Sequence, residues 1–315
     1  MKVIFDTNIW RYLVDDEAIT VVQQLCRRRK LTVVVPPATA FEFAATGDRE
    51  VRLALIRAIC SPEWKRLMPE AYTSSLEIVD ELARCRPQWM LPKTDKHRLQ
   101  PLFRDWKAKN GFWRRLTEQP DEFADVLKHA DLPTLNGARA QAYGRRKDFL
   151  AQGLTKTAHL DKWEGAFPAP REGWDGDKIE AWRPESMAAI TYALSLAHGP
   201  YWDWIRCFVD LDRVDVHGPD WLRFWLYDCE RDRLPLQWLW WAVSFLQAFR
   251  KTTDGNPADT QLAQYLPECD VFVTADKGFG WVVDECRKYD VCALPDVWII
   301  PGGGNGVTQM LARFA

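Results

Sequence analysis

The sequence predicts an α/β fold in which a parallel sheet, flanked by helices, is interrupted by a mostly helical insertion. The first observation is a short apolar run at Val3–Phe5, bounded by polar residues, which is typical of a strand buried on both faces of a parallel sheet. The second is the alternation of such runs with helical patterns near both ends of the chain. The third is the loss of that alternation from about Ser61 to Leu234.

The N-terminal part is expected to have the order β-α-β-α-α. After the strand at Val3–Phe5, the expected elements are an amphipathic helix at Asp15–Arg29, a β-branched strand at Thr32–Val35, a short helix at Ala38–Ala45 and a helix at Asp48–Ile59. Residues 61–235 follow as the predicted insertion, which is rich in Trp, Arg and Asp and shows helical periodicity without alternating strands. Residues 1–60 and 236–315 together are predicted to form one discontinuous core.

The C-terminal part resumes the α/β pattern. The expected elements are an apolar helix at Leu236–Arg250, a helix from Pro257 to about Leu266, a buried strand at Val271–Thr274, a helix at Phe279–Tyr289, strands at Val291–Leu294 and Val297–Ile300, and a terminal helix at Val307–Phe314. Proline suits the first position of a helix because its missing N–H would be unpaired there in any case.

Composition limits the classes of function. The formal net charge of the 315-residue chain is −2, so no global basic field points to nucleic acid and any such contact depends on local patches. The eight cysteines are scattered without a C-x-x-C pair, which argues against a zinc site. Without a signal peptide before the first strand, we expect reduced thiols in a cytoplasmic protein. No apolar stretch is long enough to predict a membrane span.

Four acids are predicted to meet at one edge of the sheet. Asp6 and Asp276 directly follow buried strands, and Glu42 and Asp259 lie near the starts of expected helices. Open α/β sheets bind their ligands at the carboxyl ends of strands. Each acid also has a structural explanation as a helix cap or a dipole partner, worth about 0.3–1 kcal/mol. For Glu42 that explanation is specific, because Thr39 and Glu42 match the capping-box pattern.

These pieces resemble the PIN-domain ribonucleases. The matching parts are Val3–Asn8 at the start, Glu42 in the helix after the second strand, Asp259 in a helix before the third, and Val273–Asp276. The resemblance covers roughly residues 1–60 and 236–315 and implies a PIN-like core with metal-dependent endoribonuclease activity. The predicted insertion departs from the small PIN toxins of toxin–antitoxin pairs, which have nothing similar.

The chemistry of the acids agrees with that resemblance. Clustered carboxylates with no Lys or Arg between them are hard oxygen ligands suited to Mg²⁺ or Mn²⁺. Asp6, Asp259 and Asp276 are the predicted metal ligands, and Glu42 is predicted to be a further ligand or to orient water. The family suggests that Asn8 and Thr274 orient carboxylates or water. The predicted catalytic set is therefore Asp6, Asn8, Glu42, Asp259, Thr274 and Asp276.

Other polar residues near the motifs are expected to have lesser parts. Lys277 is a candidate for a phosphate contact, with a solvated turn lysine as the alternative. Asp254 is expected to support the site, and Asp270 to flank a strand. All five histidines fall in the predicted insertion without paired spacing, which argues against a histidine-based ribonuclease mechanism.

The segment Arg84–Arg115 is a candidate contact for single-stranded RNA, with Arg114 and Arg115 as the test residues. It interleaves basic side chains with aromatic ones, which can neutralise phosphates and stack on bases. The alternative is a pair of ordinary amphipathic helices with their Trp residues in the core.

Two other functions stay open at this stage. One is a DNA or structure-specific nuclease, since flap-type nucleases use a related acid cluster. The other is a catalytically idle PIN-like module that binds RNA or protein. An antitoxin or another regulatory protein is a further partner that the resemblance leaves open.

Overall fold

The computed structural model describes residues 1–108, 110–130, 147, 151, 180–248 and 256–314. The chain divides into two compact units. The sheet unit comprises Met1–Pro69, Asp105–Gly144 and Lys251–Ala315, and the helical unit comprises Glu70–Arg104 and Arg145–Arg250. Compared with the predicted domains, residues 105–144 group with the sheet, and the apolar helix that begins at Pro235 groups with the helical unit.

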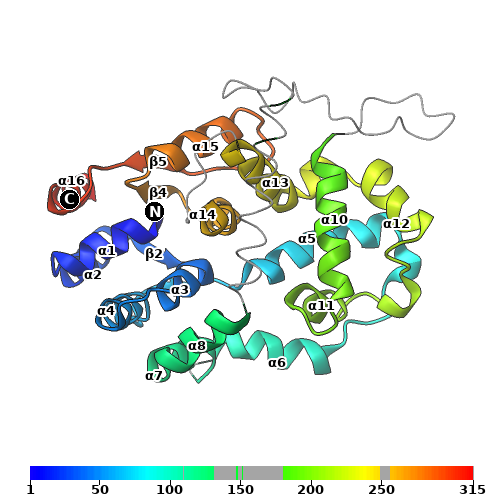
Figure 1. The fold of residues 1–315 in the computed structure, drawn as a ribbon, viewed down its shortest axis with the longest axis horizontal. Helices are drawn as coiled ribbons and strands as arrows, with labels where there is room; N and C mark the ends of the chain where they lie inside the picture. The colour runs from blue at the N-terminus through cyan, green and yellow to red at the C-terminus, as the bar shows by residue number, and fades with distance from the viewer. Residues whose placement is uncertain (109, 131–146, 148–150, 152–179, 249–255, 315) are drawn as a thin grey trace. The chain divides into compact units, whose positions relative to one another are not determined.

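The sheet has five strands, all parallel, in the order β3-β2-β1-β4-β5 (Figure 1). The strands are β1 (Lys2–Phe5), β2 (Thr32–Val35), β3 (Lys65–Arg66), β4 (Val271–Thr274) and β5 (Asp296–Ile299). The parallel sheet and the three central strands confirm the prediction.

Two details of the predicted sheet are wrong. The two-residue strand β3 lies inside the segment where no strand was expected. The expected strand at Val291–Leu294 does not form, and β5 begins only after Pro295. Val291 is nevertheless buried, so this part of the apolar run packs in the interior without pairing in the sheet.

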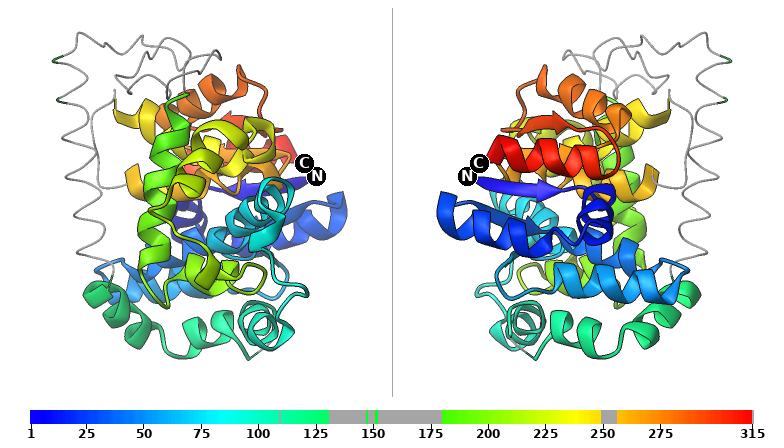
Figure 2. Two further views of the ribbon diagram at one scale, coloured as in Figure 1. Left: turned by 90° about the vertical axis from the view of Figure 1, so that its right-hand side faces the viewer. Right: turned by 90° about the vertical axis from the view of Figure 1, so that its left-hand side faces the viewer.

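Helices surround the sheet on both faces. Those of the sheet unit are α1 (Thr7–Asp15), α2 (Ile19–Arg29), α3 (Pro37–Ala44), α4 (Arg49–Ile59), α7 (Phe112–Glu118), α8 (Pro120–Ala130), α14 (Asn256–Ala263), η6 (Leu266–Glu268), α15 (Lys277–Arg287) and α16 (Gly304–Phe314). The right panel of Figure 2 shows α16 running along the same side of the sheet as α1 and α2, against which it packs.

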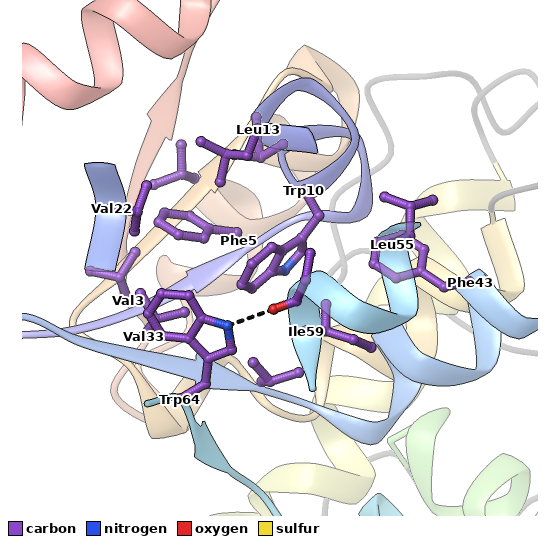
Figure 3. Close-up of a cluster of buried hydrophobic side chains, with 14 of the residues drawn as sticks. Val3, Phe5, Trp10, Leu13, Val22, Val33, Phe43, Leu55, Ile59 and Trp64 are labelled. Carbon is purple, nitrogen blue, oxygen red and sulfur yellow. Dashed lines mark hydrogen bonds between the residues drawn. The ribbon is translucent and has the colours of Figure 1, made fainter. Parts of the chain in front are cut away.

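One face of the sheet carries the main core. Val3 and Phe5 of β1 point to this face, as do alternate residues of β2 and β4, because side chains of a strand alternate between faces. Trp10 of α1 packs edge-on against both Phe5 and Trp64 (Figure 3). The indole Nε1 of Trp64 donates to the carbonyl of Ala58 at 2.8 Å. Each such side chain stabilises the fold by about 1.5–3 kcal/mol through burial, which fixes the position of α1 behind β1.

The opposite face of the sheet is covered by α15. Ile4 and Phe272, the residues between the main-core positions, are fully buried. The ring of Phe272 meets the ring of Phe279 on α15 with 5.4 Å between centroids. Helices on both faces explain why β1 and β4 are apolar throughout.

The helical unit has regular structure that is helical throughout its described residues, apart from one isolated bridge between Met90 and Val209. Its helices are α5 (Glu70–Cys85), η1 (Pro87–Trp89), α6 (Lys96–Lys107, whose last residues lie in the sheet unit), α10 (Trp182–Ser195), α11 (Pro200–Ile205), η3 (Leu211–Arg213), α12 (Pro219–Arg223), η4 (Phe224–Asp228), η5 (Arg231–Arg233) and α13 (Pro235–Ala248). Buried tryptophans such as Trp182, Trp221 and Trp225 form its interior.

None of the eight cysteines, all of which lie in the described part of the chain, forms a disulfide bond. Burial raises the pKa of the Cys229 and Cys269 thiols to about 12, so neither is poised as a thiolate nucleophile. Among the described residues, no helix combines the length and the apolar character needed to cross a membrane.

Candidate active site

The candidate site lies where the two central strands end side by side. In the register of β1 and β4, Phe5 pairs with Val273, so the next residues along each strand, Asp6 and Thr274, are neighbours. The backbone N–H of Asp6 donates to the carbonyl of Val273 at 2.9 Å, which extends the ladder by one residue. The sheet itself therefore brings together two of the predicted site residues that are 268 positions apart in the sequence.

Asp6 is the centre of a hydrogen-bond network. Its Oδ2 accepts from the side-chain amide of Asn8 at 2.7 Å and from the hydroxyl of Thr274 at 2.5 Å. Its Oδ1 accepts from the backbone N–H of Thr7 at 2.8 Å, so Asp6 is also the N-cap of α1. The side chain is 4% exposed, and each donor fixes the direction of one carboxylate oxygen.

The same network ties the two sequence motifs to each other. The hydroxyl of Thr274 accepts from the backbone N–H of Asp276 at 2.9 Å while it donates to Asp6. The side-chain oxygen of Asn8 accepts from the backbone N–H of Ala275 at 3.1 Å. Asn8 and Thr274 thus link the loop after β1 to the loop after β4 and set the positions of the two acids.

Asp276 begins α15 as its N-cap. Its Oδ1 accepts from the backbone N–H groups of Gly278 and Phe279, at 2.5 Å and 3.0 Å, in the usual capping manner. Its Oδ2 accepts no hydrogen bond from the described residues, and the side chain is exposed. Capping therefore uses one oxygen of the carboxylate and leaves the other for the predicted part as a metal ligand.

Glu42 faces this network from α3. It is half-buried and hydrogen-bonded to the side chain of Thr7, next to Asp6. The capping-box explanation for Glu42 is wrong, because α3 begins earlier, with Pro36 at its N-cap. The buried hydroxyl of Thr39 has no hydrogen-bond partner among the described residues. Glu42 therefore lies well inside α3, where its side chain contacts Thr7.

Thr7 is the residue that the sequence reasoning missed. Its backbone holds one oxygen of Asp6 and its side chain contacts Glu42, so it joins two predicted catalytic acids. Thr7 could have been predicted from the sequence because it lies between Asp6 and Asn8, which were both predicted to be site residues.

The electrostatics of the acids are those of crowded, partly desolvated carboxylates. Burial raises the pKa of Asp6, and the charge of Asp276 adds to the rise, although hydrogen bonds from Thr274, Thr7 and Asn8 oppose it. Burial also raises the pKa of Glu42 to about 7, with a further contribution from the charge of Asp6. The three acids therefore influence one another in pairs, Asp6 with Asp276 and Glu42 with Asp6.

The other acids singled out in the sequence differ in their surroundings. Asp259 is half-buried in the first turn of α14, which packs against α3, the helix of Glu42. Asp254 falls outside the described residues. Asp270 flanks β4 as expected, with its carboxylate accepting from the backbone N–H of Lys2 at 2.7 Å.

The described residues contain no group of three or more Asp, Glu, His or Cys side chains placed to hold a metal ion together. The donors at hand still suit a hard divalent cation, because they are carboxylate oxygens, one of which accepts no hydrogen bond. Mg²⁺ in particular is often held by only one or two carboxylates, with water in its other positions. Asp6 and Asp276 are the pair that fits this mode.

The predicted substrate contacts differ in their surroundings. Lys277 is exposed at the first position of α15, directly after Asp276. Arg114 pairs with Glu118 at 2.7 Å, and Arg115 forms two hydrogen bonds to the carboxylate of Asp105. The arginine side chains therefore already have acidic partners in the sheet unit.

The aromatic residues between the basic ones are mostly buried. Phe112 and Trp113 belong to the main core of the sheet unit, and Trp89 is buried in the helical unit. The burial of these three rings favours the alternative of ordinary amphipathic helices with their Trp residues in the core. Phe103 remains substantially exposed.

Comparison of the chain with models of protein families, with curated proteins and with solved structures found no match.

Proposed function

We propose that the chain is a metal-dependent endoribonuclease with a PIN-like core, in which the helical unit is the insertion. The observation that carries the proposal is the network that fixes Asp6 and Asp276 beside each other at the carboxyl ends of β1 and β4. Supporting observations are the all-parallel sheet and the contact of Glu42 with Thr7. Ligand sites of open α/β sheets lie at this edge.

In the proposed site, Asp6 and Asp276 hold Mg²⁺ or Mn²⁺, with Asp259 as a further acid on the neighbouring helix. A cation bound there would supply positive charge to activate a water molecule and to stabilise the negative charge on the leaving oxygen of a phosphodiester. Glu42, with a pKa of about 7, is suited to accept or release a proton near neutrality. Asn8 and Thr274 keep the carboxylate of Asp6 in one orientation.

The proposal extends to substrate and partners. Lys277, which directly follows Asp276 and is exposed, is the proposed phosphate contact. RNA contacts by Arg114 and Arg115 would compete with the acidic partners of these two residues. A cytoplasmic location with reduced thiols is part of the same proposal. An antitoxin or another regulatory protein is compatible with the same proposal.

The test is cleavage of labelled single-stranded RNA and DNA by wild type with Mg²⁺, with Mn²⁺ and with a chelator. We expect internal cleavage of RNA that requires either cation. Cleavage of DNA in preference to RNA would support a DNA nuclease instead. RNA binding without cleavage under any of these conditions would support an idle binding module.

A further inference from the structure

Helix α6 carries a basic surface without acidic partners. Its residues Lys96, Arg104 and Lys107 are exposed, and none of the three forms an ion pair with another described residue. Arg98 of the same helix differs, because its guanidinium pairs with Asp95 at 3.3 Å. The charges of the three exposed cations are therefore available to a ligand.

The three cations share one side of the helix. α6 is one unbroken helix, so its own geometry fixes how its side chains are arranged around its axis. At about 100° per residue, Lys96, Arg104 and Lys107 fall within about 80° of one another and span about 16–17 Å along the axis. The single acid of α6, Asp105, lies on another side, where its carboxylate accepts two hydrogen bonds from Arg115. We call the three cations the α6 basic stripe.

Positive charge also gathers at the C-terminal end of this stripe. Partial burial and the charge of Lys65, an exposed residue of β3, lower the pKa of the Lys107 ammonium group, while the charge of Glu268 acts in the opposite direction. Lys65 and Lys107 belong to the same compact unit. Two like charges that act on each other are unfavourable in the free protein, and a bound anion would relieve part of this repulsion.

The stripe faces solvent rather than the interior. No residue of α6 is fully buried, and its half-buried apolar residues Leu99, Leu102 and Trp106 lie on another side of the helix. Phe103 is on the same side as the stripe, but its ring already packs edge-on against Tyr72. The exposed side of α6 therefore offers positive charge rather than a free aromatic face.

We propose that the α6 basic stripe binds the phosphate backbone of single-stranded RNA. The inference rests on the proposed function and adds to it a substrate contact made by residues outside the candidate active site. Lysine and arginine side chains that neutralise phosphates release counter-ions from the RNA, which gives affinity without reading the sequence. Because the chain has a formal net charge of −2, attraction of RNA depends on a local patch of this kind.

The composition of the stripe favours a nucleic acid over an acidic protein. Protein interfaces usually have an apolar centre surrounded by a polar rim. The stripe consists of two lysines and one arginine, with Gln100 between them, and Phe103 is the only large apolar residue exposed on α6. A row of cations without an apolar centre suits a polyanion whose charges repeat along a backbone.

The experiment measures binding of a short labelled single-stranded RNA by fluorescence anisotropy over a series of salt concentrations, with chelator present so that no cleavage occurs. The test variant, Lys96→Gln/Arg104→Gln/Lys107→Gln, removes the three charges and keeps residues that favour a helix. We expect the slope of the logarithm of the binding constant against the logarithm of the salt concentration to fall in magnitude by about 2–3. Binding at low salt should weaken about tenfold.

The matched control removes the same number of charges from cations that already have acidic partners. Arg98, Arg213 and Lys288 each pair with an acid three residues earlier, and each side chain is at least half exposed. The variant Arg98→Gln/Arg213→Gln/Lys288→Gln therefore has the same net charge as the test variant, and it should keep the wild-type slope. Thermal unfolding shows whether both variants are folded.

A second arm locates the contact on the wild-type protein and needs no variant. Exposed lysines are acetylated with acetic anhydride in the presence and absence of the RNA, and the modification of each lysine is measured by mass spectrometry. RNA should protect Lys96 and Lys107. Lys30, an exposed lysine at the end of α2 that forms no ion pair with the described residues, should react equally in both samples.

Three outcomes would overturn the stripe while leaving the nuclease proposal intact: an unchanged salt slope in the test variant, equal losses in the test variant and the control, or no protection of Lys96 and Lys107. Polyglutamate that binds wild type but not the test variant, with RNA binding unchanged, would assign the stripe to an acidic protein instead. Absence of cleavage by wild type would overturn the nuclease proposal, and a lowered slope with protected lysines would still support the stripe.

Discussion

Replacing Thr274 by Val tests the network at the centre of the site. Valine has nearly the same shape as threonine, so the core around this fully buried residue stays filled. What is lost is one hydroxyl, which donates to Asp6 at 2.5 Å and accepts from the N–H of Asp276 at 2.9 Å. The change therefore leaves a buried carboxylate oxygen without one of its donors and a backbone N–H without its acceptor.

The expected cost follows from these two contacts. A buried polar group left without its hydrogen-bond partner costs about 1–3 kcal/mol, and more when the group is charged. One of the two groups affected here is the buried carboxylate of Asp6. Because Asp276 is exposed and water can replace part of its bond, we expect Thr274→Val to lower the free energy of unfolding by about 2–4 kcal/mol. For a domain of about 150–250 residues this corresponds to a fall in melting temperature of about 5–15 °C.

Thr274→Ser is the matched control, because it keeps the hydroxyl and removes one methyl group. That change should cost about 0.5–1.5 kcal/mol. The assay is urea and thermal unfolding of wild type and both variants in chelator. Since the lost donor served the charged form of Asp6, the deficit of Thr274→Val should be larger at high pH, where Asp6 is ionised, than at low pH, where it is protonated. Equal stability of the two variants would refute the network.

Three further predictions concern groups outside that network. Burial raises the pKa of Glu77 to about 8, although the backbone N–H groups of Leu236 and Gln237 donate hydrogen bonds to its carboxylate. The folded protein therefore keeps this carboxyl group protonated where the unfolded chain releases the proton, and the free energy of unfolding should fall as pH rises from about 4.5 to about 8. In urea unfolding across this range, Glu77→Gln should show a smaller fall. The double change Arg114→Ala/Arg115→Ala should leave the salt dependence of RNA binding unchanged, because both side chains pair with acids. If the slope of the logarithm of the binding constant against the logarithm of the salt concentration fell in magnitude by about 2, the two arginines would contact phosphates. If Asp259 is a metal ligand, Asp259→Asn should be as stable as wild type or more stable in chelator, and should lose most of the Mn²⁺-dependent rise in melting temperature. A variant that is less stable in chelator and keeps this rise would show that Asp259 only interacts with the dipole of α14.

The central sheet was predictable because its signals are local. Val3–Phe5, Thr32–Val35 and Val271–Thr274 are short apolar runs that end at polar or proline residues, and burial on both faces allows little else. The edge strand β3 had no such signal, since Lys65 and Arg66 are charged and pair with β2 through their backbones alone. Such edge strands are set by tertiary structure rather than by side-chain pattern.

The candidate site was predictable to the level of its motifs. The predicted order of strands and helices was enough to place Asp6 and Asp276 at one edge of the sheet. Their link through Thr274 depends on the register between β1 and β4, which cannot be predicted from the local sequence pattern. The Thr39–Glu42 match to a capping box misled because two prolines start α3 earlier.

Interleaved basic and aromatic residues also carried two meanings. The rings of Phe112 and Trp113 serve the core, and only their burial in the structure distinguishes that arrangement from a stacking surface.

The most direct test of the account is the change Asp276→Asn. Asparagine is as good an N-cap as aspartate, so one side-chain oxygen can still accept from the N–H groups of Gly278 and Phe279 and α15 should keep its start. The charge at the site is lost. Wild type and variant are compared by melting temperature in chelator and in Mn²⁺, and by cleavage of single-stranded RNA.

We expect Asp276→Asn to melt within a few degrees of wild type in chelator, to lose the Mn²⁺-dependent rise in melting temperature, and to cleave RNA more slowly by orders of magnitude. Asp276→Ala is the structural comparison, and it should also lose about 0.5–2 kcal/mol of stability with the cap. An Asp276→Asn variant that keeps both the Mn²⁺ effect and wild-type cleavage would contradict the assignment of this edge of the sheet as the active site.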